Sequence, residues 1–142
     1  IVFPNLKVTL VDSLNKRIEF LKLVIDELKL DKIEVINSRV EDLKIREKYE
    51  VVTARAVANL HILLELVTPI SKKYVVLMKG EAKEELENTS RLYQELNLKL
   101  LETKEFLLPS ENSKRTLIKY EKIKPPNIKY PRNFGTIKKH PL

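Results

Sequence analysis

Along this chain, short runs of apolar residues alternate with longer stretches in which apolar residues recur at regular intervals among polar ones. The first run, residues 7–11, is rich in β-branched residues and predicts a strand. Apolar residues then recur every three or four positions, the spacing of a helix with one buried face; they are Leu14, Ile18, Leu21, Ile25 and Leu28. We expect Ser13 to cap this helix, because its hydroxyl oxygen can accept a backbone hydrogen bond.

The same succession continues through the middle of the chain. Strands are predicted at 33–36, 50–53 and 74–78, and helices at 56–67 and 81–96. Strands that alternate with helices of this length predict right-handed crossovers. The result is a mainly parallel sheet with helices on both faces.

The pattern changes after residue 98. Residues 99–108 and 114–123 predict two strands, and the polar turn between them, 109–113, leaves no room for a helix. These strands should pair antiparallel. A parallel sheet that ends in an antiparallel hairpin is typical of class I (Rossmann-like) methyltransferases, whereas dinucleotide dehydrogenases usually continue in parallel. The predicted fold class is therefore α/β, with a C-terminal antiparallel hairpin.

The positive charge is concentrated at the end of the chain. The formal charge is +7, and residues 124–142 hold five basic residues and no acidic one. Pro125 and Pro126 should stop regular structure. We therefore expect one partial domain, residues 1–123, followed by an extended basic tail, residues 124–142. The tail is either a solvated end or a segment that binds a polyanion.

The residue inventory excludes several kinds of active site. The chain has no cysteine, which removes disulfides, thiolate metal sites and a cysteine nucleophile and fits a cytoplasmic location. His61 falls within a predicted helix and His140 within the basic tail, and no common catalytic motif occurs. No run approaches the roughly 18 apolar residues that span a bilayer. We predict no catalytic side chain, no metal and no membrane partner.

Polar residues follow the first two predicted strands, at the edge where open parallel sheets bind ligands. Asp12 could accept hydrogen bonds from the ribose hydroxyls of an adenosine cofactor, or it could serve the start of the following helix. The segment 38–42 should lie beside it. Its backbone amides and Glu41 could meet an adenine ring, or the segment could be a capped turn.

Basic residues follow the next two strands. Arg55 comes between a predicted buried strand and a leucine-rich helix, where a cation needs an ionic partner or a ligand. A structural salt bridge and a cofactor contact are both open. Lys79 follows the strand 74–78 and has the same two interpretations.

The basic tail interleaves Tyr130 and Phe134 with lysine and arginine. Aromatic rings can stack on unpaired bases while cations hold phosphates, so this composition favours RNA as a partner.

Five motifs, taken in order, resemble one family. They are residues 8–17 (VTLVDSLNKR), 39–41 (RVE), 53–58 (TARAVA), 77–80 (LMKG) and 129–142 (KYPRNFGTIKKHPL). The chain is similar over essentially its whole length to the bacterial 16S ribosomal RNA guanine-N7 methyltransferases (RsmG/GidB), also called glucose-inhibited division protein B. The resemblance implies S-adenosylmethionine as cofactor, and 16S ribosomal RNA or the small ribosomal subunit as partner.

The resemblance also implies roles for individual residues. Val40 and Glu41 match the pair on the adenine side of the cofactor, and Arg55 matches the arginine of the cofactor pocket. Asp12 fits the ribose position by its place after the strand. RNA contacts are assigned to basic and aromatic residues: Lys16, Arg17, Lys129, Tyr130, Arg132, Phe134, Lys138 and Lys139.

The family differs from this sequence at the front. Its members have a further strand and a glycine-rich loop before the strand matched by 7–11, whereas this chain has only Gly80 and Gly135. We therefore expect a methyltransferase domain that lacks its first strand and does not bind the cofactor unaided. Two other hypotheses stay open: an NAD-dependent oxidoreductase domain, which Asp12 permits, and a non-catalytic RNA-binding module that uses the basic tail.

Overall fold

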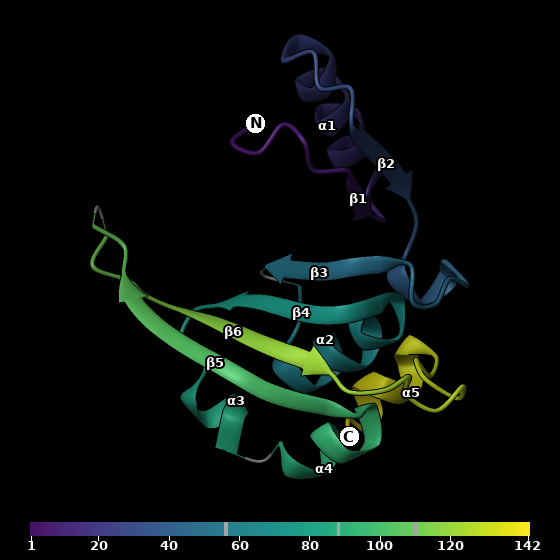
Figure 1. Cartoon of the computed structure of the whole chain (residues 1–142), viewed down its shortest axis with the longest axis vertical. Helices are drawn as coiled ribbons and strands as arrows, with labels where there is room; N and C mark the ends of the chain where they lie inside the picture. The colour runs from purple at the N-terminus through teal and green to yellow at the C-terminus, as the bar shows by residue number, and fades with distance from the viewer. Residues whose placement is uncertain (56, 88, 110) are drawn as a thin grey trace. The chain divides into compact units, whose positions relative to one another are not determined.

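The computed structural model describes residues 1–55, 57–87, 89–109 and 111–142, and its contacts divide the chain into two compact units (Figure 1). Unit 1 holds residues 1–44 and unit 2 holds residues 45–142. This boundary differs from the expected one after residue 123. The predicted helices 56–67 and 81–96 and the predicted turn 109–113 include Ala56, Asn88 and Ser110, which lie outside the described residues.

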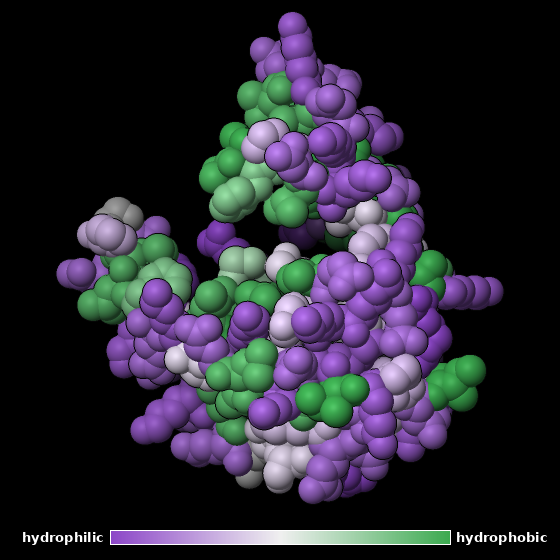
Figure 2. Space-filling model, in the orientation of Figure 1, coloured by the Kyte–Doolittle hydropathy of each residue, from purple (hydrophilic) through white to green (hydrophobic). Residues whose placement is uncertain are grey.

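Unit 1 is a strand–helix–strand unit, as predicted. β1 (Val8–Asp12) and β2 (Ile33–Asn37) pair in parallel, with α1 (Asn15–Glu27) between them and the single turn η1 (Val40–Asp42) after them. Of the predicted apolar stripe, only Ile18 is buried. Phe20 and Leu23 are 64% and 67% exposed, and Figure 2 shows green apolar surface where α1 lies.

Unit 2 contains a four-stranded sheet in the order β3-β4-β6-β5. The strands are β3 (Tyr49–Arg55), β4 (Ser71–Lys79), β5 (Leu98–Leu107) and β6 (Lys114–Lys122). β3 and β4 are parallel, and β6 is antiparallel to both β4 and β5. The predicted hairpin is confirmed, and it closes one side of the sheet.

The core of unit 2 lies on one face of this sheet. Val75 and Leu77 of β4 are fully buried, and so are their β6 partners Tyr120 and Ile118. The neighbouring positions point to the other face because side chains alternate along a strand, and Met78 there is 38% exposed. The central helix is α2 (Leu60–Val67), which continues into the turn η2 (Thr68–Ile70) and contacts β4.

Three shorter helices pack against α2 or the sheet: α3 (Lys83–Glu87), α4 (Ser90–Leu96) and α5 (Phe134–Lys139). The single helix predicted over 81–96 is therefore two helices. The Thr89 hydroxyl donates to the carbonyl of Leu86 at 2.8 Å, a local bond of the kind that competes with helical backbone bonding.

The basic tail is not extended throughout, and this prediction is wrong for residues 134–139, which form α5. The Asn133 side chain caps α5 by accepting from the Thr136 N–H at 2.9 Å. Ile137 and Tyr130 are buried, with 0% and 2% exposure. The tail is thus packed into unit 2.

Candidate functional site

Asp12 ends β1 and organises the start of α1. Its Oδ1 accepts from the Leu14 N–H at 2.8 Å, and its Oδ2 lies 3.2 Å from Arg17 Nη1. The Leu14 hydrogen bond is the main cause that lowers the pKa of Asp12, and Arg17 lowers it further. Asp12 rather than Ser13 therefore serves the helix start. Each carboxylate oxygen has a second lone pair and can accept another donor, such as a ribose hydroxyl.

The segment 38–42 lies beside Asp12, as the strand order predicts. The Ser38 N–H donates to the Asp12 carbonyl at 3.1 Å, which extends the register of β1 and β2. Val40 and Glu41 then form η1, and Glu41 Oε1 lies 3.7 Å from Arg39 Nη1. Unit 1 thus brings Asp12, Val40 and Glu41 to one edge of its strand pair. Their contact with an adenosine stays a prediction.

Arg55 is the last residue of β3 and belongs to unit 2. Its side chain is exposed, and that side chain makes no hydrogen bond or ion pair with the residues that the structure describes. The expectation of a buried cation is therefore wrong. Arg55 is opposite Met78 in the register, on the exposed face of the sheet, so it carries little desolvation cost. Its cofactor role rests on the resemblance and stays a prediction.

Lys79 ends β4 and holds the loop that follows Arg55. Its Nζ donates to the Ala58 carbonyl at 2.9 Å and lies 3.0 Å from Glu85 Oε2. The same carboxylate accepts from the Leu60 N–H at the start of α2. Glu85 was not singled out from the sequence, since it lies among other glutamates in a polar stretch. The end of β4, the start of α2 and α3 are therefore joined through this cluster.

The predicted RNA contacts fall into exposed and internal groups. Lys16 and Arg17 are exposed on α1, and Lys138 and Lys139 are exposed in the last turn of α5. Lys129 is also exposed, and its Nζ lies 3.6 Å from Glu95. Their contact with RNA stays a prediction.

Tyr130, Arg132 and Phe134 differ from that exposed group. Tyr130 is 2% exposed, so its ring is not accessible to an unpaired base in this conformation. Phe134 is half-buried. The Arg132 guanidinium makes two hydrogen bonds to Glu65, at 2.8 and 2.7 Å. The fold uses Tyr130 and Arg132 internally.

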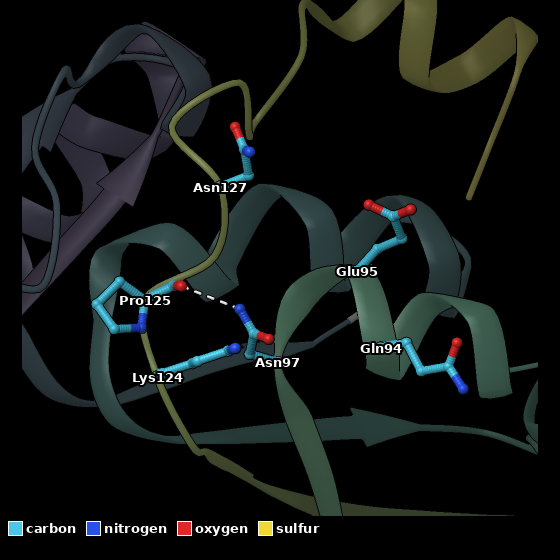
Figure 3. A pocket seen from close by; sticks show the side chains of 6 residues that line it. All are labelled: Gln94, Glu95, Asn97, Lys124, Pro125 and Asn127. Atoms are coloured by element: carbon cyan, nitrogen blue, oxygen red, sulfur yellow. Dashed lines mark hydrogen bonds between the residues drawn. The ribbon is translucent and has the colours of Figure 1, made fainter.

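A surface depression of about 490 Å³ lies between α4, the start of β5 and the basic tail (Figure 3). Its lining residues are Gln94, Glu95, Asn97, Lys124, Pro125 and Asn127. Figure 3 shows the Asn97 amide donating to the Pro125 carbonyl, at 2.9 Å. The register pairs Leu98 with Lys122, at the end of the sheet where β4 begins. The depression is thus at the opposite end of the sheet from Arg55.

Residues 1–55, 57–87, 89–109 and 111–142 contain no group of three or more histidine, aspartate or glutamate side chains placed to hold a metal ion. No helix in these ranges has the length and apolar character needed to cross a membrane.

Comparison with known sequences gives the family. The sequence profile described as rRNA small subunit methyltransferase G (GidB) matches residues 1–117. The chain belongs to this family. The ribosomal RNA small subunit methyltransferase G of Lysinibacillus sphaericus is 46% identical, with 100% of this chain and 63% of the relative covered. That of Lactobacillus johnsonii is 43% identical, with 100% and 62% covered. The chain thus spans somewhat less than two thirds of the length of these relatives.

Solved structures with a similar fold are methyltransferases. TYW2 of M. jannaschii in complex with AdoMet has a TM-score of 0.62 at 16% identity, covering 82% of this chain and 59% of that one. The magnesium protoporphyrin IX methyltransferase of Synechocystis with bound SAM has a TM-score of 0.64 at 8% identity, covering 80% and 58%. At these identities the likeness concerns the fold alone. The predicted class I methyltransferase fold is confirmed, and membership of the GidB family disfavours the oxidoreductase hypothesis.

Proposed function

We propose that this chain is part of an S-adenosylmethionine-dependent methyltransferase that acts in the cytoplasm on N7 of a guanine in 16S ribosomal RNA. The observation that carries the proposal is the match of the methyltransferase G profile to residues 1–117. Relatives with that name align with the whole chain at 42–46% identity. Because the chain spans only 62–63% of their length, the activity is proposed for the complete protein.

Unit 1 supplies groups that suit an adenosine. A carboxylate that stays ionised is a strong acceptor for hydroxyl groups, and the pKa of Asp12 is lowered by the Leu14 N–H. We propose that Asp12 accepts from the ribose hydroxyls and that Val40 and Glu41 meet the adenine ring. Arg55 is proposed as a further cofactor contact, through the resemblance of residues 53–58 to the family motif.

The reaction needs little proton chemistry from the protein. Guanine N7 has a lone pair and no proton, and the bound cofactor supplies a methyl group on a positively charged sulfur. In-line attack therefore requires no general base and no covalent enzyme intermediate. The protein has to bind and align both reactants, an effect that can be worth roughly 7 to 11 kcal/mol in favourable intramolecular cases.

The distribution of charge supports a polyanionic substrate. Unit 1 has eight basic and eight acidic residues, so the whole excess of +7 belongs to unit 2. Phosphates of RNA are attracted by such an excess, and the attraction falls with rising salt. We propose that 16S ribosomal RNA or the small ribosomal subunit contacts Lys129, Lys138 and Lys139, the exposed lysines of the basic tail that were assigned to RNA, together with Lys16 and Arg17.

A chimaera tests the proposal. In the Lysinibacillus relative, the matched 63% is replaced by this chain, and methyl transfer from labelled donor to naked 16S ribosomal RNA and to small subunits is measured. We expect incorporation into at least one substrate, with strand scission after borohydride and aniline treatment at a single guanine. Absence of incorporation by a folded chimaera, with the unaltered relative active in the same assay, would reject the proposal.

A further inference from the structure

Arg132 connects three parts of unit 2. Its guanidinium binds both carboxylate oxygens of Glu65 on α2, and its backbone N–H donates to Glu65 Oε1 at 3.0 Å. Its Nη2 also donates to the carbonyl of His140, the C-cap residue of α5, at 3.0 Å. One side chain therefore fixes the beginning of this part of the tail to α2 and closes the end of α5.

α5 depends on such contacts. It has six residues, and isolated helices shorter than about 12 to 15 residues are marginal in water. Ile137 is the residue that α5 buries, and Asn133 caps its first turn. The Arg132 contact, the Asn133 cap and the buried Ile137 hold α5 in place, and Lys138 and Lys139 stay exposed.

Upstream contacts fix the approach of the tail. Arg46 donates to the carbonyls of Tyr130 and Pro126 at 2.6 and 3.0 Å. The Tyr130 hydroxyl donates to Glu95 at 2.7 Å. Residues 126–132 are therefore tied to unit 2 before α5 begins, and the chain has little freedom to carry α5 elsewhere.

The end of the tail reaches the first turn of α2. Arg132 contacts Glu65 in the last part of α2, whereas the oxygen of Leu142 lies 2.7 Å from Nδ1 of His61, the second residue of that helix. The tail thus runs along α2 from its end towards its beginning. Leu142 therefore lies beside the first turn of α2, and Lys79 ties the residues just before that turn to the end of β4 through the Ala58 carbonyl.

We propose that Arg132 and Glu65 are positioning residues that hold α5 with Lys138 and Lys139 exposed in its last turn, where the two lysines bind phosphates of the substrate RNA. The inference rests on the proposed function and assigns different roles to the cations of the basic tail. Arg132 acts inside the protein through Glu65. Lys138 and Lys139 act outside it, on the nucleic acid.

The first experiment measures binding of the 142-residue chain to naked 16S ribosomal RNA over a series of salt concentrations. Lys138→Gln/Lys139→Gln should weaken binding and make the slope of log affinity against log salt shallower by about 1.4, at roughly 0.7 per phosphate contact with a single strand. The control, Lys99→Gln/Lys104→Gln, removes the same charge from exposed positions of β5. If the salt slope of Lys138→Gln/Lys139→Gln equals that of the control variant, the proposal that these two lysines contact RNA is overturned.

The second experiment tests the positioning role with Arg132→Lys, which keeps the charge but cannot make the two-pronged contact. We expect faster amide exchange in residues 134–140, unchanged exchange in β4 and β6, and a loss of RNA affinity that is absent when Lys138 and Lys139 are already glutamine. Unchanged RNA affinity with faster exchange in α5 overturns the positioning role.

Asn133→Ala provides the same test if Arg132→Lys does not fold, because it removes the α5 cap without touching Glu65. It should give the same loss of RNA affinity, and full affinity with an unprotected α5 overturns the positioning role. Failure of the inference is distinguishable from failure of the proposed function. If the chimaera transfers methyl groups but Lys138→Gln/Lys139→Gln leaves its RNA affinity unchanged, only the inference about Lys138 and Lys139 is rejected.

Discussion

Arg132 and Glu65, 67 positions apart in the sequence, form a two-pronged ion pair in which the carboxylate is completely buried. The distances are 2.8 Å from Nε to Oε1 and 2.7 Å from Nη2 to Oε2. A carboxylate removed from water needs strong donors, and three of them come from Arg132. The hydrogen bond to Glu65 is the main cause that raises the pKa of Arg132. The Arg132 guanidinium therefore stays charged over the whole pH range in which the protein is folded.

Arg132→Met should destabilise unit 2 substantially, because it leaves a buried carboxylate without its cation. Removing one partner of a buried pair typically costs about 3 to 5 kcal/mol, and the lower end applies because the Arg132 side chain is 25% exposed. Urea unfolding measures the loss. The double variant Glu65→Leu/Arg132→Met should lose less free energy of unfolding than Arg132→Met alone, since no unpaired charge remains.

Arg115→Met is the matched control. Arg115 pairs with the exposed Glu111 at 3.4 Å, and exposed pairs contribute about 0 to 1 kcal/mol. Equal losses for Arg115→Met and Arg132→Met would contradict the stabilising role of the Glu65 pair.

The strands and the direction in which neighbours pair could be predicted from the sequence, because they depend on local apolar patterns and on the length of the connections. The run at 7–11 and the alternation on both sides of 109–113 give parallel and antiparallel pairs that the structure contains. Exposure was harder to predict. The burial of Arg55 was inferred from the apolar residues around it, but the helices of unit 2 cover the face of its sheet that holds Val75 and Leu77, and Arg55 points to the other face.

The packing of the basic tail could not be predicted because its partners lie far away in sequence and its apolar residues, such as Tyr130 and Ile137, are isolated among polar ones. One signal was present. Glu65 is the only charged residue between Leu60 and Val67, a stretch of mostly leucine, and an acid at such a position needs a cation from elsewhere. The tail supplies that cation at Arg132, which composition alone could not distinguish from Lys138 or Lys139.

Asp12→Ala should loosen the start of α1, whereas Asp12→Asn should largely preserve it. Both oxygens of Asp12 have partners, and the bond from the Leu14 N–H is kept by an asparagine oxygen. Loss of a side-chain acceptor at a helix start costs about 0.5 to 2 kcal/mol. Amide exchange of residues 14–18 measures the effect. Equal protection in the two variants would contradict the helix-start role.

The same carboxylate predicts a response to acid. Its pKa in the folded protein is lowered from the ordinary value of 3.8, chiefly by the Leu14 N–H. Its contribution to stability is therefore fully present above pH 3.8 and is lost as the pH falls through the lower folded-state value. Protection of the Leu14 amide, followed by NMR during an acid titration, should fall in that range in the wild type. Asp12→Asn should not show this step, and a step of equal size in that variant would assign it to another group.

In the methyltransferase chimaera, Asp12→Asn should weaken binding of S-adenosylhomocysteine by roughly 10- to 100-fold, since hydrogen bonds to a charged acceptor contribute about 1.5 to 3 kcal/mol. Calorimetry measures the affinity, and Asp26→Asn, an exposed aspartate at the other end of α1, is the control. An Asp12→Asn affinity equal to that of the control would leave Asp12 with the helix-start role alone.

Glu85→Ala should release the loop between Arg55 and α2. Glu85 accepts from the Leu60 N–H and pairs with Lys79, whose side chain is only 12% exposed. The change removes a helix-start acceptor and leaves a nearly buried ammonium without its carboxylate, so we expect a loss of about 1 to 2 kcal/mol. Amide exchange should rise in residues 57–63, while Glu84→Ala, an exposed neighbour in α3, should change nothing there.

Glu85→Gln separates the two effects, because it keeps the acceptor for Leu60 and removes only the charge opposite Lys79. If Glu85→Gln exchanged as fast as Glu85→Ala, the ion pair rather than the hydrogen bond would hold the loop, and Lys79→Met should then reproduce the same exchange pattern.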